Sequence, residues 1–310
     1  MRFISSEEIV KAWSWPWLIE QMQAAFTSEY VAPPRHHHDI PQDGTLLLMP
    51  AWEPQGFLGM KLVHVFPNNA NVGLPAISGL YILSEGQHGQ PVACFEGAEL
   101  TRRRTAAASA VASQLLARPD SRTLLLVGTG QLAPMLLEAH ASVRPIERVL
   151  VWGRNPERVQ SLIQTYANQF VCEPVTDIST AIGQADIISC ATLSSEPIIW
   201  GADLPEGVHL DLVGAFKSTM RESDSEAVAR SRVYVDTWAG AKGEAGDLLQ
   251  AEAEGQFQWS DAIADIRTLL LQPELGRQSP QDRTLFKSVG ASFEDLAAAV
   301  ALWQQLSASN

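Results

Sequence analysis

Short apolar runs alternate with helix-like segments between residues 119 and 290, and this alternation constrains the fold more than any other feature. The runs TLLLV, RVLVW, DIISC and HLDLV have the length of strands that are buried on both faces. Helical segments or turns connect them, as they connect the strands of a parallel sheet. We therefore predict an α/β fold in which residues 119–290 form a Rossmann-type, doubly wound parallel sheet.

The first 118 residues show a different pattern, which predicts a separate α+β domain. We expect a helix over 5–30, an irregular Pro- and His-rich loop over 31–44, an antiparallel sheet over 45–95, and an Ala-rich helix over 98–117. A last helix, within residues 291–310, is expected to pack back on this domain. The predicted domains are thus 1–118, joined by 291–310, and 119–290.

Charge and cysteine content exclude several classes of function. Lys plus Arg is 22 and Asp plus Glu is 35, which gives a formal net charge of −13. We expect neither nucleic acid nor an anionic membrane as a partner, because both attract basic surfaces. Cys94, Cys172 and Cys190 are too few and too far apart for a disulfide framework or a zinc cluster, and they suit a reducing, cytoplasmic location. No apolar run has the length of a signal peptide or a membrane span.

The segment GTGQLA (128–133) follows the first strand of the parallel sheet and precedes a helix. In this context Gly128 permits a tight turn, Gly130 lets a pyrophosphate approach the backbone, and Ala133 allows close helix packing. Thr129 and Gln131 lie in the same loop. The segment therefore predicts a dinucleotide site with phosphates at the helix N-terminus.

The end of the second strand indicates which dinucleotide is bound. NAD-specific sites place a carboxylate there, on the ribose 2′-hydroxyl. Here the segment is VWGRN, with Arg154 and Asn155 and no carboxylate. A guanidinium suits a 2′-phosphate, so we predict NADPH, with NADH as the alternative. Further cofactor contacts are expected after the next two strands, at Thr192, Ser194, Val213 and Gly214.

Several motifs together resemble one known family. They are PPR (33–35), LMPAW (48–52), GMKLV (59–63), RTAAASA (104–110), GTGQLA (128–133), RESD (221–224) and FKSVGASFEDLAAA (286–299). In this order they are similar to the ornithine cyclodeaminase/mu-crystallin family. The resemblance implies a Rossmann domain, a second domain that binds substrate and forms a homodimer, and a nicotinamide-dependent reaction of an amino or imino acid.

The resemblance also implies roles for particular residues. Arg35 and Arg104 match the arginines that hold the substrate carboxylate, and Lys61 matches the lysine near the reacting carbon and nitrogen. Val289 lies in the segment that returns toward the nicotinamide. The chemistry agrees, because a carboxylate favours a bidentate guanidinium and an imine must be protonated before it accepts hydride.

One segment departs from the cyclodeaminase pattern. Cyclodeaminases carry an aspartate in a segment of the form G-D-x-P-G-K-T-E, where this chain reads GAFKSTMRE (214–222) and has Phe216. Ring closure with loss of ammonia would lack its base. We therefore expect NADPH-dependent reduction of a small cyclic 2-imino acid, either 1-pyrroline-2-carboxylate to proline or 1-piperideine-2-carboxylate to pipecolate. Ornithine cyclodeaminase, an amino-acid dehydrogenase and a non-catalytic NADPH or small-molecule binder stay open as alternatives.

Three other features are interpreted as structural. The histidines at 36–38 lack the spacing of a catalytic zinc site, so we predict no metal. The segment SEGQHGQPVA (84–93) is interpreted as a turn. Asp295 is interpreted as a dimer or hinge residue without a catalytic role.

Overall fold

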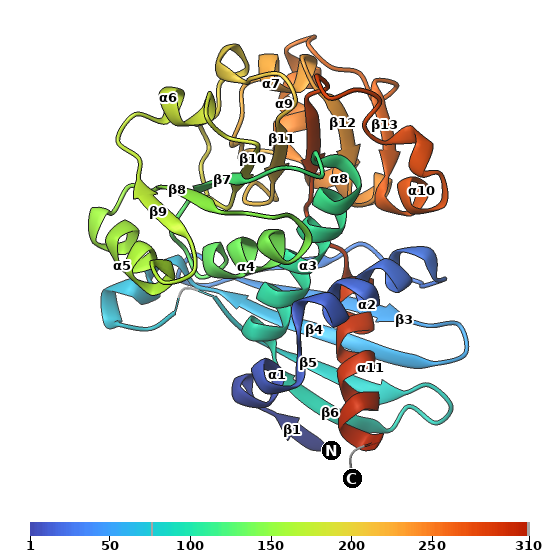
Figure 1. Ribbon diagram of the computed structural model, residues 1–310. Coiled ribbons are helices and arrows are strands. Elements are labelled where there is room, and N and C mark those ends of the chain that lie inside the picture. Colours follow the sequence, from blue (N-terminus) through green and yellow to red (C-terminus); the bar gives the residue numbers. More distant parts are fainter. Residues whose placement is uncertain (76, 309–310) are drawn as a thin grey trace. The chain divides into compact units, whose positions relative to one another are not determined.

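The structure is a computed structural model that describes residues 1–75 and 77–308 (Figure 1). The chain divides into two compact units, unit 1 with residues 1–105 and 291–310, and unit 2 with residues 106–290. The chain first passes from unit 1 to unit 2 within helix α3 (Gly97–Leu116). The sequence suggested a boundary after residue 118, just beyond the end of this helix. The structure places the boundary inside the helix, after residue 105.

Unit 1 contains a six-stranded sheet in the order β1-β6-β5-β4-β3-β2. The strands are β1 (Arg2–Ile4), β2 (His36–Ile40), β3 (Gly44–Trp52), β4 (Phe57–Val65), β5 (Ile77–Glu85) and β6 (Pro91–Glu96), and a 3-10 turn η1 (Pro67–Val72) lies between β4 and β5. Neighbours from β2 to β6 pair antiparallel, whereas β1 pairs parallel with β6. The antiparallel sheet expected over 45–95 is therefore present.

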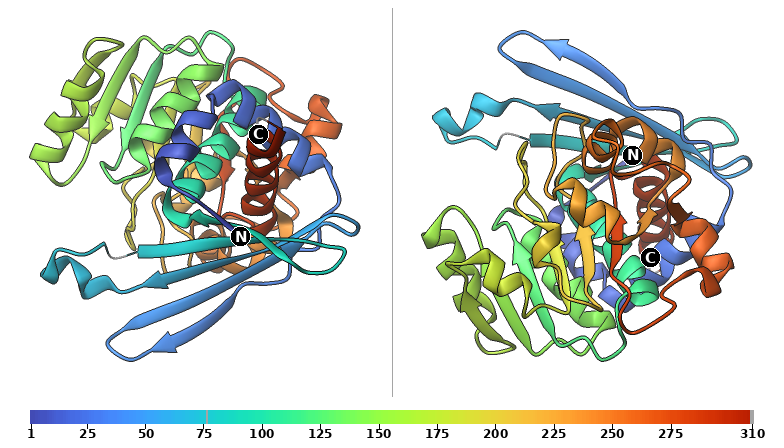
Figure 2. Two further views of the ribbon diagram at one scale, coloured as in Figure 1. Left: turned by 90° about the horizontal axis from the view of Figure 1, so that it is seen from below. Right: turned by 90° about the horizontal axis from the view of Figure 1, so that it is seen from above.

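Helices cover one face of this sheet. They are α1 (Ser6–Ala12), α2 (Trp15–Thr27) and α11 (Ser292–Ala308). Helix α11 packs against α2 and against β3, β4 and β5, and Figure 2 shows it and α2 on the same side of the strands. Alternate side chains of β3, such as Leu47, Met49 and Ala51, point to this side and are buried.

Two expectations for unit 1 are wrong. The helix expected over 5–30 is two helices, because Trp13 has an extended backbone and Pro16, in the first turn of α2, cannot continue a preceding helix. The segment expected to be an irregular loop contains β2, whose residues pair antiparallel with β3 from His36–Leu48 to Ile40–Gly44. All of β2 is exposed, and the apolar pattern that marks a buried strand is therefore missing.

Unit 2 contains an eight-stranded parallel sheet in the order β13-β12-β14-β11-β10-β7-β8-β9. The strands are β7 (Thr123–Val127), β8 (Arg148–Trp152), β9 (Val171–Pro174), β10 (Ile187–Cys190), β11 (His209–Leu212), β12 (Arg232–Val235), β13 (Ala262–Asp265) and β14 (Thr284–Lys287). The helical segments between them are α4 (Ala133–Val143), α5 (Pro156–Tyr166), α6 (Ile178–Ile182), η2 (Gly201–Asp203), α7 (Ser225–Ala229), α8 (Trp238–Glu244), α9 (Gly246–Ala253), α10 (Ile266–Leu271) and η3 (Pro273–Leu275). The predicted doubly wound sheet is confirmed, and its order reverses between β7 and β10.

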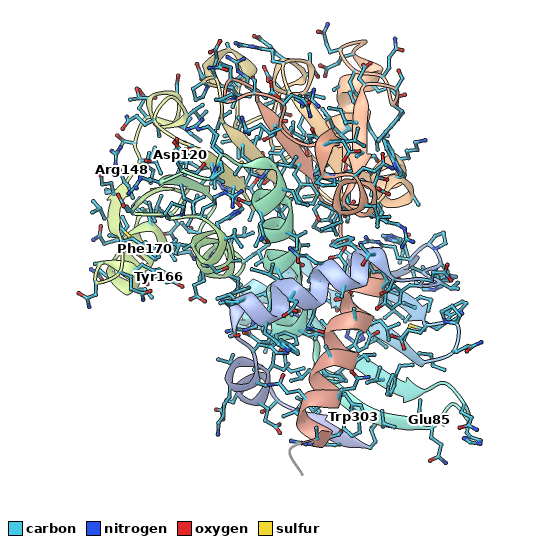
Figure 3. All side chains as sticks on the ribbon, turned by 45° about the vertical axis from the view of Figure 1, so that its right-hand side comes forward. Glu85, Asp120, Arg148, Tyr166, Phe170 and Trp303 are labelled. Atoms are coloured by element: carbon cyan, nitrogen blue, oxygen red, sulfur yellow. The ribbon has the colours of Figure 1, made fainter. Side chains whose placement is uncertain are left out.

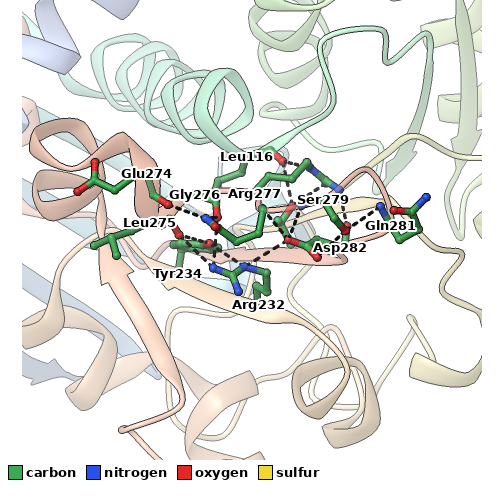
Figure 4. Close-up of polar contacts among 12 residues, drawn as sticks. Leu116, Arg232, Tyr234, Glu274, Leu275, Gly276, Arg277, Ser279, Gln281 and Asp282 are labelled. Carbon is green, nitrogen blue, oxygen red and sulfur yellow. Dashed lines mark hydrogen bonds and ion pairs between the residues drawn. The ribbon is translucent and has the colours of Figure 1, made fainter.

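Buried apolar residues on the central strands form the core of unit 2. Arg277 holds the loop between η3 and β14 in place. Arg277 donates from Nε to the Leu116 carbonyl over 2.7 Å and from Nη2 to Thr284 Oγ1 over 3.1 Å (Figure 4). Tyr234 Oη donates to the Leu275 carbonyl over 2.8 Å. These bonds hold η3 against β12, and the segment after η3 against β14 and the end of α3.

The segment 84–93 forms a hairpin turn, as expected. The Glu85 carboxylate accepts hydrogen bonds from the backbone N–H groups of Gln87, His88 and Gln90 at 2.9, 2.9 and 3.2 Å. Figure 3 labels Glu85 in this hairpin. Within the described residues, no helix is both long and apolar enough to cross a bilayer.

Candidate active site

Four buried charged side chains meet in unit 1. Lys61, on β4, has its Nζ 2.7 Å from Oδ2 of Asp295, in the first turn of α11. Arg104, on α3, donates from Nε to Asp295 Oδ1 over 2.9 Å and from Nη1 to Glu294 Oε2 over 2.6 Å. All four side chains are at most 4 % exposed. Two cations and two carboxylates therefore balance one another away from water.

Local structure explains why these residues converge. Lys61 lies between Gly59 and Val63 on the face of β4 that turns toward the helices, because side chains alternate along a strand. Glu294 and Asp295 occupy the N-terminal turn of α11, where the helix dipole favours negative charge. Glu294 also accepts a hydrogen bond from the Ala291 N–H over 2.9 Å and so stabilises the start of the helix.

The protonation of this cluster follows from its burial. Burial lowers the pKa of Lys61 to about 8, with Arg104 and Arg35 acting in the same direction and Asp295 against it. Burial also disfavours the charge of Asp295, but Arg104 and Lys61 hold the pKa of that carboxyl below its ordinary value. Lys61 is therefore a stronger acid than an ordinary lysine, next to a carboxylate that stays ionised.

Two further residues belong to the surroundings of Lys61. Arg35 is half-buried just before β2, and its charge reaches Lys61 strongly enough to lower the lysine pKa. Tyr81 is the cross-strand partner of Lys61 on β5. Tyr81 is fully buried, and its hydroxyl makes no hydrogen bond within the described part of the chain. The structure thus brings Lys61, Arg104 and Arg35 together, as the family resemblance implies.

Asp295, interpreted from the sequence as a dimer or hinge residue, has surroundings that the sequence analysis did not anticipate. Its side chain is fully buried and pairs with both Lys61 and Arg104. Sequence reasoning missed Glu294 as well. The available signal was an acidic pair at the start of an otherwise apolar helix, where each carboxylate must find a buried partner.

In unit 2, the loop after β7 has the geometry that a dinucleotide requires. Gly128 has φ +115°, and a Cβ there would lie 2.7 Å from the Ala191 carbonyl oxygen, so only glycine fits. A Cβ on Gly130 would meet no atom within 4 Å, which leaves space beside the backbone. Thr129 is half-buried and Gln131 is exposed in the same loop. Ala133 is the first residue of α4 and is buried against the sheet.

The end of β8 carries the two residues expected near the ribose. Arg154 is exposed. The Asn155 side chain caps α5, accepting from the N–H groups of Glu157 and Arg158 over 2.9 and 3.1 Å. Asn155 therefore has a structural role that the sequence analysis did not assign to it.

The other expected cofactor contacts lie at the carboxyl ends of neighbouring strands. Thr192 and Ser194 follow β10, Val213 and Gly214 follow β11, and Val289 follows β14. Backbone N–H groups in these loops donate to buried carboxylates that sequence reasoning did not single out. Thr192 and Gly214 donate to Glu222, and Val289 donates to Asp236 over 2.7 Å.

The remaining residues discussed from the sequence are Phe216 and the histidines at 36–38. Phe216, at the position of the cyclodeaminase aspartate, packs against the hydrophobic core of unit 2. His36 and His38 lie on one side of β2 with ring centroids 6.4 Å apart. Across residues 1–75 and 77–308, no group of three or more His, Cys, Asp or Glu side chains is arranged to hold a metal ion.

A nicotinamide dinucleotide fits the residues of unit 2. The Gly128 turn, the open side of Gly130 and the N-terminus of α4 form a cradle for a pyrophosphate at the point where the strand order reverses. The sequence pattern of the ornithine cyclodeaminase/mu-crystallin family matches residues 4–310. The chain belongs to this family. The resemblance drawn from the motifs is confirmed over nearly the whole length.

Relatives in the family are similar over both units. Delta(1)-pyrroline-2-carboxylate reductase of Colwellia psychrerythraea is 34 % identical over 315 residues, which cover 99 % of this chain and 99 % of that protein. The Thermococcus litoralis delta(1)-pyrroline-2-carboxylate reductase, solved in complex with NADH and L-proline, is 31 % identical with a TM-score of 0.94, covering 98 % of this chain and 97 % of that one. An archaeal alanine dehydrogenase dimer with bound NAD is 25 % identical with a TM-score of 0.92, covering 100 % and 97 %.

These similarities confirm that this family member is an enzyme of the oxidoreductase class that acts on carbon–nitrogen bonds with a nicotinamide cofactor.

Proposed function

We propose that the protein is a delta(1)-pyrroline-2-carboxylate reductase, which converts the cyclic imine to proline, with the six-membered homologue as a second substrate. The observation that carries the proposal is Lys61, a buried lysine whose ammonium pairs with Asp295, the carboxylate that also pairs with Arg104. One methylene contributes only about 1–3 kcal/mol of discrimination, so both ring sizes are expected to react. The similarity to reductases across both units supports the same reaction.

Arg104 and Arg35 are proposed to hold the substrate carboxylate. The Nε and Nη1 atoms of Arg104 are engaged by Asp295 and Glu294, which fixes the plane of the guanidinium. Its Nη2 donates to no described residue and is therefore the nitrogen left for a substrate oxygen. Arg35 supplies a second cation near Lys61. A carboxylate held in this way would keep the imine nitrogen close to the lysine.

Lys61 is proposed to protonate the imine nitrogen. With a pKa of about 8, the ammonium is mostly protonated at neutral pH and yet gives up its proton more readily than an ordinary lysine. Asp295 keeps the Nζ in place and stays ionised throughout. Reduced nicotinamide supplies the hydride when bound. One proton and one hydride added across C=N then give the secondary amine.

NADPH is the proposed reductant. The support is Arg154, an exposed arginine after β8, where an NAD-specific site would carry a carboxylate. The Thermococcus litoralis reductase was solved with NADH, so NADH is the alternative to be measured. The three cysteines are free, which supports the proposal of a cytoplasmic enzyme.

The proposed assembly is a homodimer formed through the outer face of the sheet in unit 1. Trp52, Leu58 and Leu80 lie on that face and are 39, 39 and 40 % exposed. Apolar neighbours on the same face extend the patch, namely Leu46, Leu48, Met60, Leu62 and Ile82. A face of this kind is more apolar than a monomer usually exposes, and a second copy would cover it.

The experiment that tests the activity follows the absorbance of reduced nicotinamide with each cyclic imine, using NADPH and NADH in parallel. Consumption with 1-pyrroline-2-carboxylate and formation of proline are expected. Ornithine with NAD is assayed beside it for ammonia. Ammonia and proline from ornithine, with no turnover of either imine, would replace the proposal by the cyclodeaminase reaction.

A further inference from the structure

Glu222 joins two loops of unit 2 through a fully buried carboxylate. Its Oε1 accepts hydrogen bonds from the Thr192 N–H over 2.6 Å and from Thr192 Oγ1 over 2.8 Å. Its Oε2 accepts from the Gly214 N–H over 2.7 Å. Thr192 follows β10 and Gly214 follows β11, so one side chain fixes the spacing between the two strand ends.

These loops border the turn that fits the dinucleotide. A Cβ on Gly128 would meet the Ala191 carbonyl oxygen at 2.7 Å and Thr192 Cγ2 at 3.4 Å. On the other side, Gly214 packs directly on the Thr192 backbone. The segment after β10 is thus enclosed between Gly128 and Gly214, where doubly wound sheets bind their ligands.

The charges around Glu222 do not balance. Lys287 Nζ lies 3.0 Å from Asp247 Oδ2, and Asp247 Oδ1 accepts from the Glu222 N–H over 2.7 Å. Glu222, Asp247 and Lys287 are all fully buried. Two carboxylates and one ammonium give a formal charge of 1 − 2 = −1. An excess buried charge opposes folding.

The raised pKa of Glu222 agrees with an excess of negative charge in this cluster. Burial raises the pKa of Glu222 to about 7, Lys287 acts against the rise and Asp247 adds to it. Besides Asp247 from α9 and Lys287 from β14, the titratable groups nearby are Cys190 on β10 and Asp211 on β11. The pKa of the Cys190 thiol is raised well above its ordinary value by burial and by these carboxylates, so it stays neutral. Burial therefore disfavours the charge of Glu222, which the hydrogen bonds from Thr192 and Gly214 stabilise.

We infer that Glu222 is a positioning residue that sets the loop after β10 for dinucleotide binding. A carboxylate has two acceptor oxygens and can hold N–H groups from two loops at once. A glutamine has one acceptor oxygen, and its amide group would face an N–H donor at either Thr192 or Gly214. The inference rests on the dinucleotide site proposed for unit 2 and does not depend on which imine is reduced.

The test compares Glu222→Gln with the wild type and with Glu206→Gln, a matched change at an exposed residue of the same unit. Dissociation constants for NADPH and NADH are measured by titration calorimetry, and the melting temperature is measured without ligand. We expect Glu222→Gln to raise the dinucleotide dissociation constant at least about tenfold, as loss of a hydrogen bond to a charged group does. The variant should stay folded at the assay temperature, because loss of the excess buried charge offsets the N–H group left without an acceptor, and Glu206→Gln should change neither the dissociation constant nor the melting temperature.

The pH dependence provides a second readout. Wild-type affinity for the dinucleotide should weaken as the pH falls through about 7, because a protonated Glu222 cannot accept from both loops. Affinity of Glu222→Gln should show no such step. An unchanged dissociation constant in Glu222→Gln, or a fall in its melting temperature that accounts for the weaker binding, would overturn the inference.

The wild type separates this inference from the proposed function. Dinucleotide binding without turnover of any imine would reject the reductase proposal and leave the role of Glu222 standing. A wild type that binds no dinucleotide would overturn both.

Discussion

Lys61 Nζ and Asp295 Oδ2 lie 2.7 Å apart, in surroundings that leave the two side chains 4 % and 0 % exposed. Each charge is stabilised by the other, because both side chains are almost fully buried. Arg104 completes the balance by pairing with the second oxygen of Asp295. The acidity of Lys61 is therefore set by its burial, by Arg104 on α3, by Asp295 on α11 and by Arg35 just before β2.

Replacement of Lys61 by methionine removes the ammonium and keeps the length of the side chain. We expect the turnover number for imine reduction to fall by about 100-fold or more, as loss of a general acid does. Dinucleotide affinity should be unchanged, because the Gly128 loop is in unit 2. Steady-state kinetics and calorimetry check both, with Lys11→Met, an exposed lysine of α1, as the control. Full activity in Lys61→Met would remove the lysine from the mechanism.

The rate of imine reduction should depend on pH through Lys61. Its pKa is lowered to about 8, and the reaction requires the protonated form. The rate should be level below that pH and fall as the pH rises through it, whereas proline oxidation should rise over the same interval. A pH–rate profile in both directions measures this. If the Lys61→Met variant still lost activity as the pH rose through about 8, the pH dependence would have to come from another group.

Asp295→Asn removes the carboxylate that holds the Lys61 charge. Burial and Arg104 would then lower the lysine pKa further, so the descending limb should move to lower pH. Breaking a buried ion pair costs about 3–5 kcal/mol, and the free energy of unfolding should decrease by about that amount. Chemical denaturation gives the second quantity and pH–rate profiles the first. An unshifted limb would show that Asp295 does not act on Lys61.

Arg154→Ser tests the preference for NADPH. Loss of the guanidinium should raise the KM for NADPH at least about tenfold, since a charged hydrogen bond contributes about 1.5–3 kcal/mol. The KM for NADH should stay the same. Arg158→Ser, an exposed arginine on the neighbouring helix α5, is the control. Equal effects on the two cofactors would contradict recognition of a 2′-phosphate by Arg154.

Leu80→Asp tests the proposed dimer. A carboxylate on the outer face of β5 would be buried without a partner in the dimer interface, which is energetically unfavourable. The variant should therefore sediment as a monomer where the wild type is a dimer. Leu271→Asp is the matched control, because Leu271 is 60 % exposed on α10 of unit 2. Dimers of Leu80→Asp as stable as those of the wild type would place the interface elsewhere.

Local patterns predict those parts of this fold in which neighbouring residues determine the structure. The apolar run of β7, the turn at Gly128 and the start of α4 follow from a few adjacent residues. Strand β2 was missed because it is an exposed edge strand whose partner, β3, supplies the pattern.

The candidate site was predictable only in part. Lys61, Arg35 and Arg104 came from family motifs, and the structure brings them together. Their counter-ions could not be derived in the same way. Asp295 and Glu294 lie about 190 or more residues away from Arg104 in the chain, and only the folded packing shows which cation each carboxylate meets.

The insertion of unit 2 between the two parts of unit 1 determines when the Lys61 site becomes complete during synthesis. The ribosome makes β4 and α3 early, but Asp295 and Glu294 belong to α11, the last helix. Until α11 emerges, Lys61 and Arg104 have none of the carboxylates that neutralise them in the finished protein. Domains generally fold as units in the order of synthesis, and unit 2 is therefore able to form before the sheet of unit 1 closes around its charges.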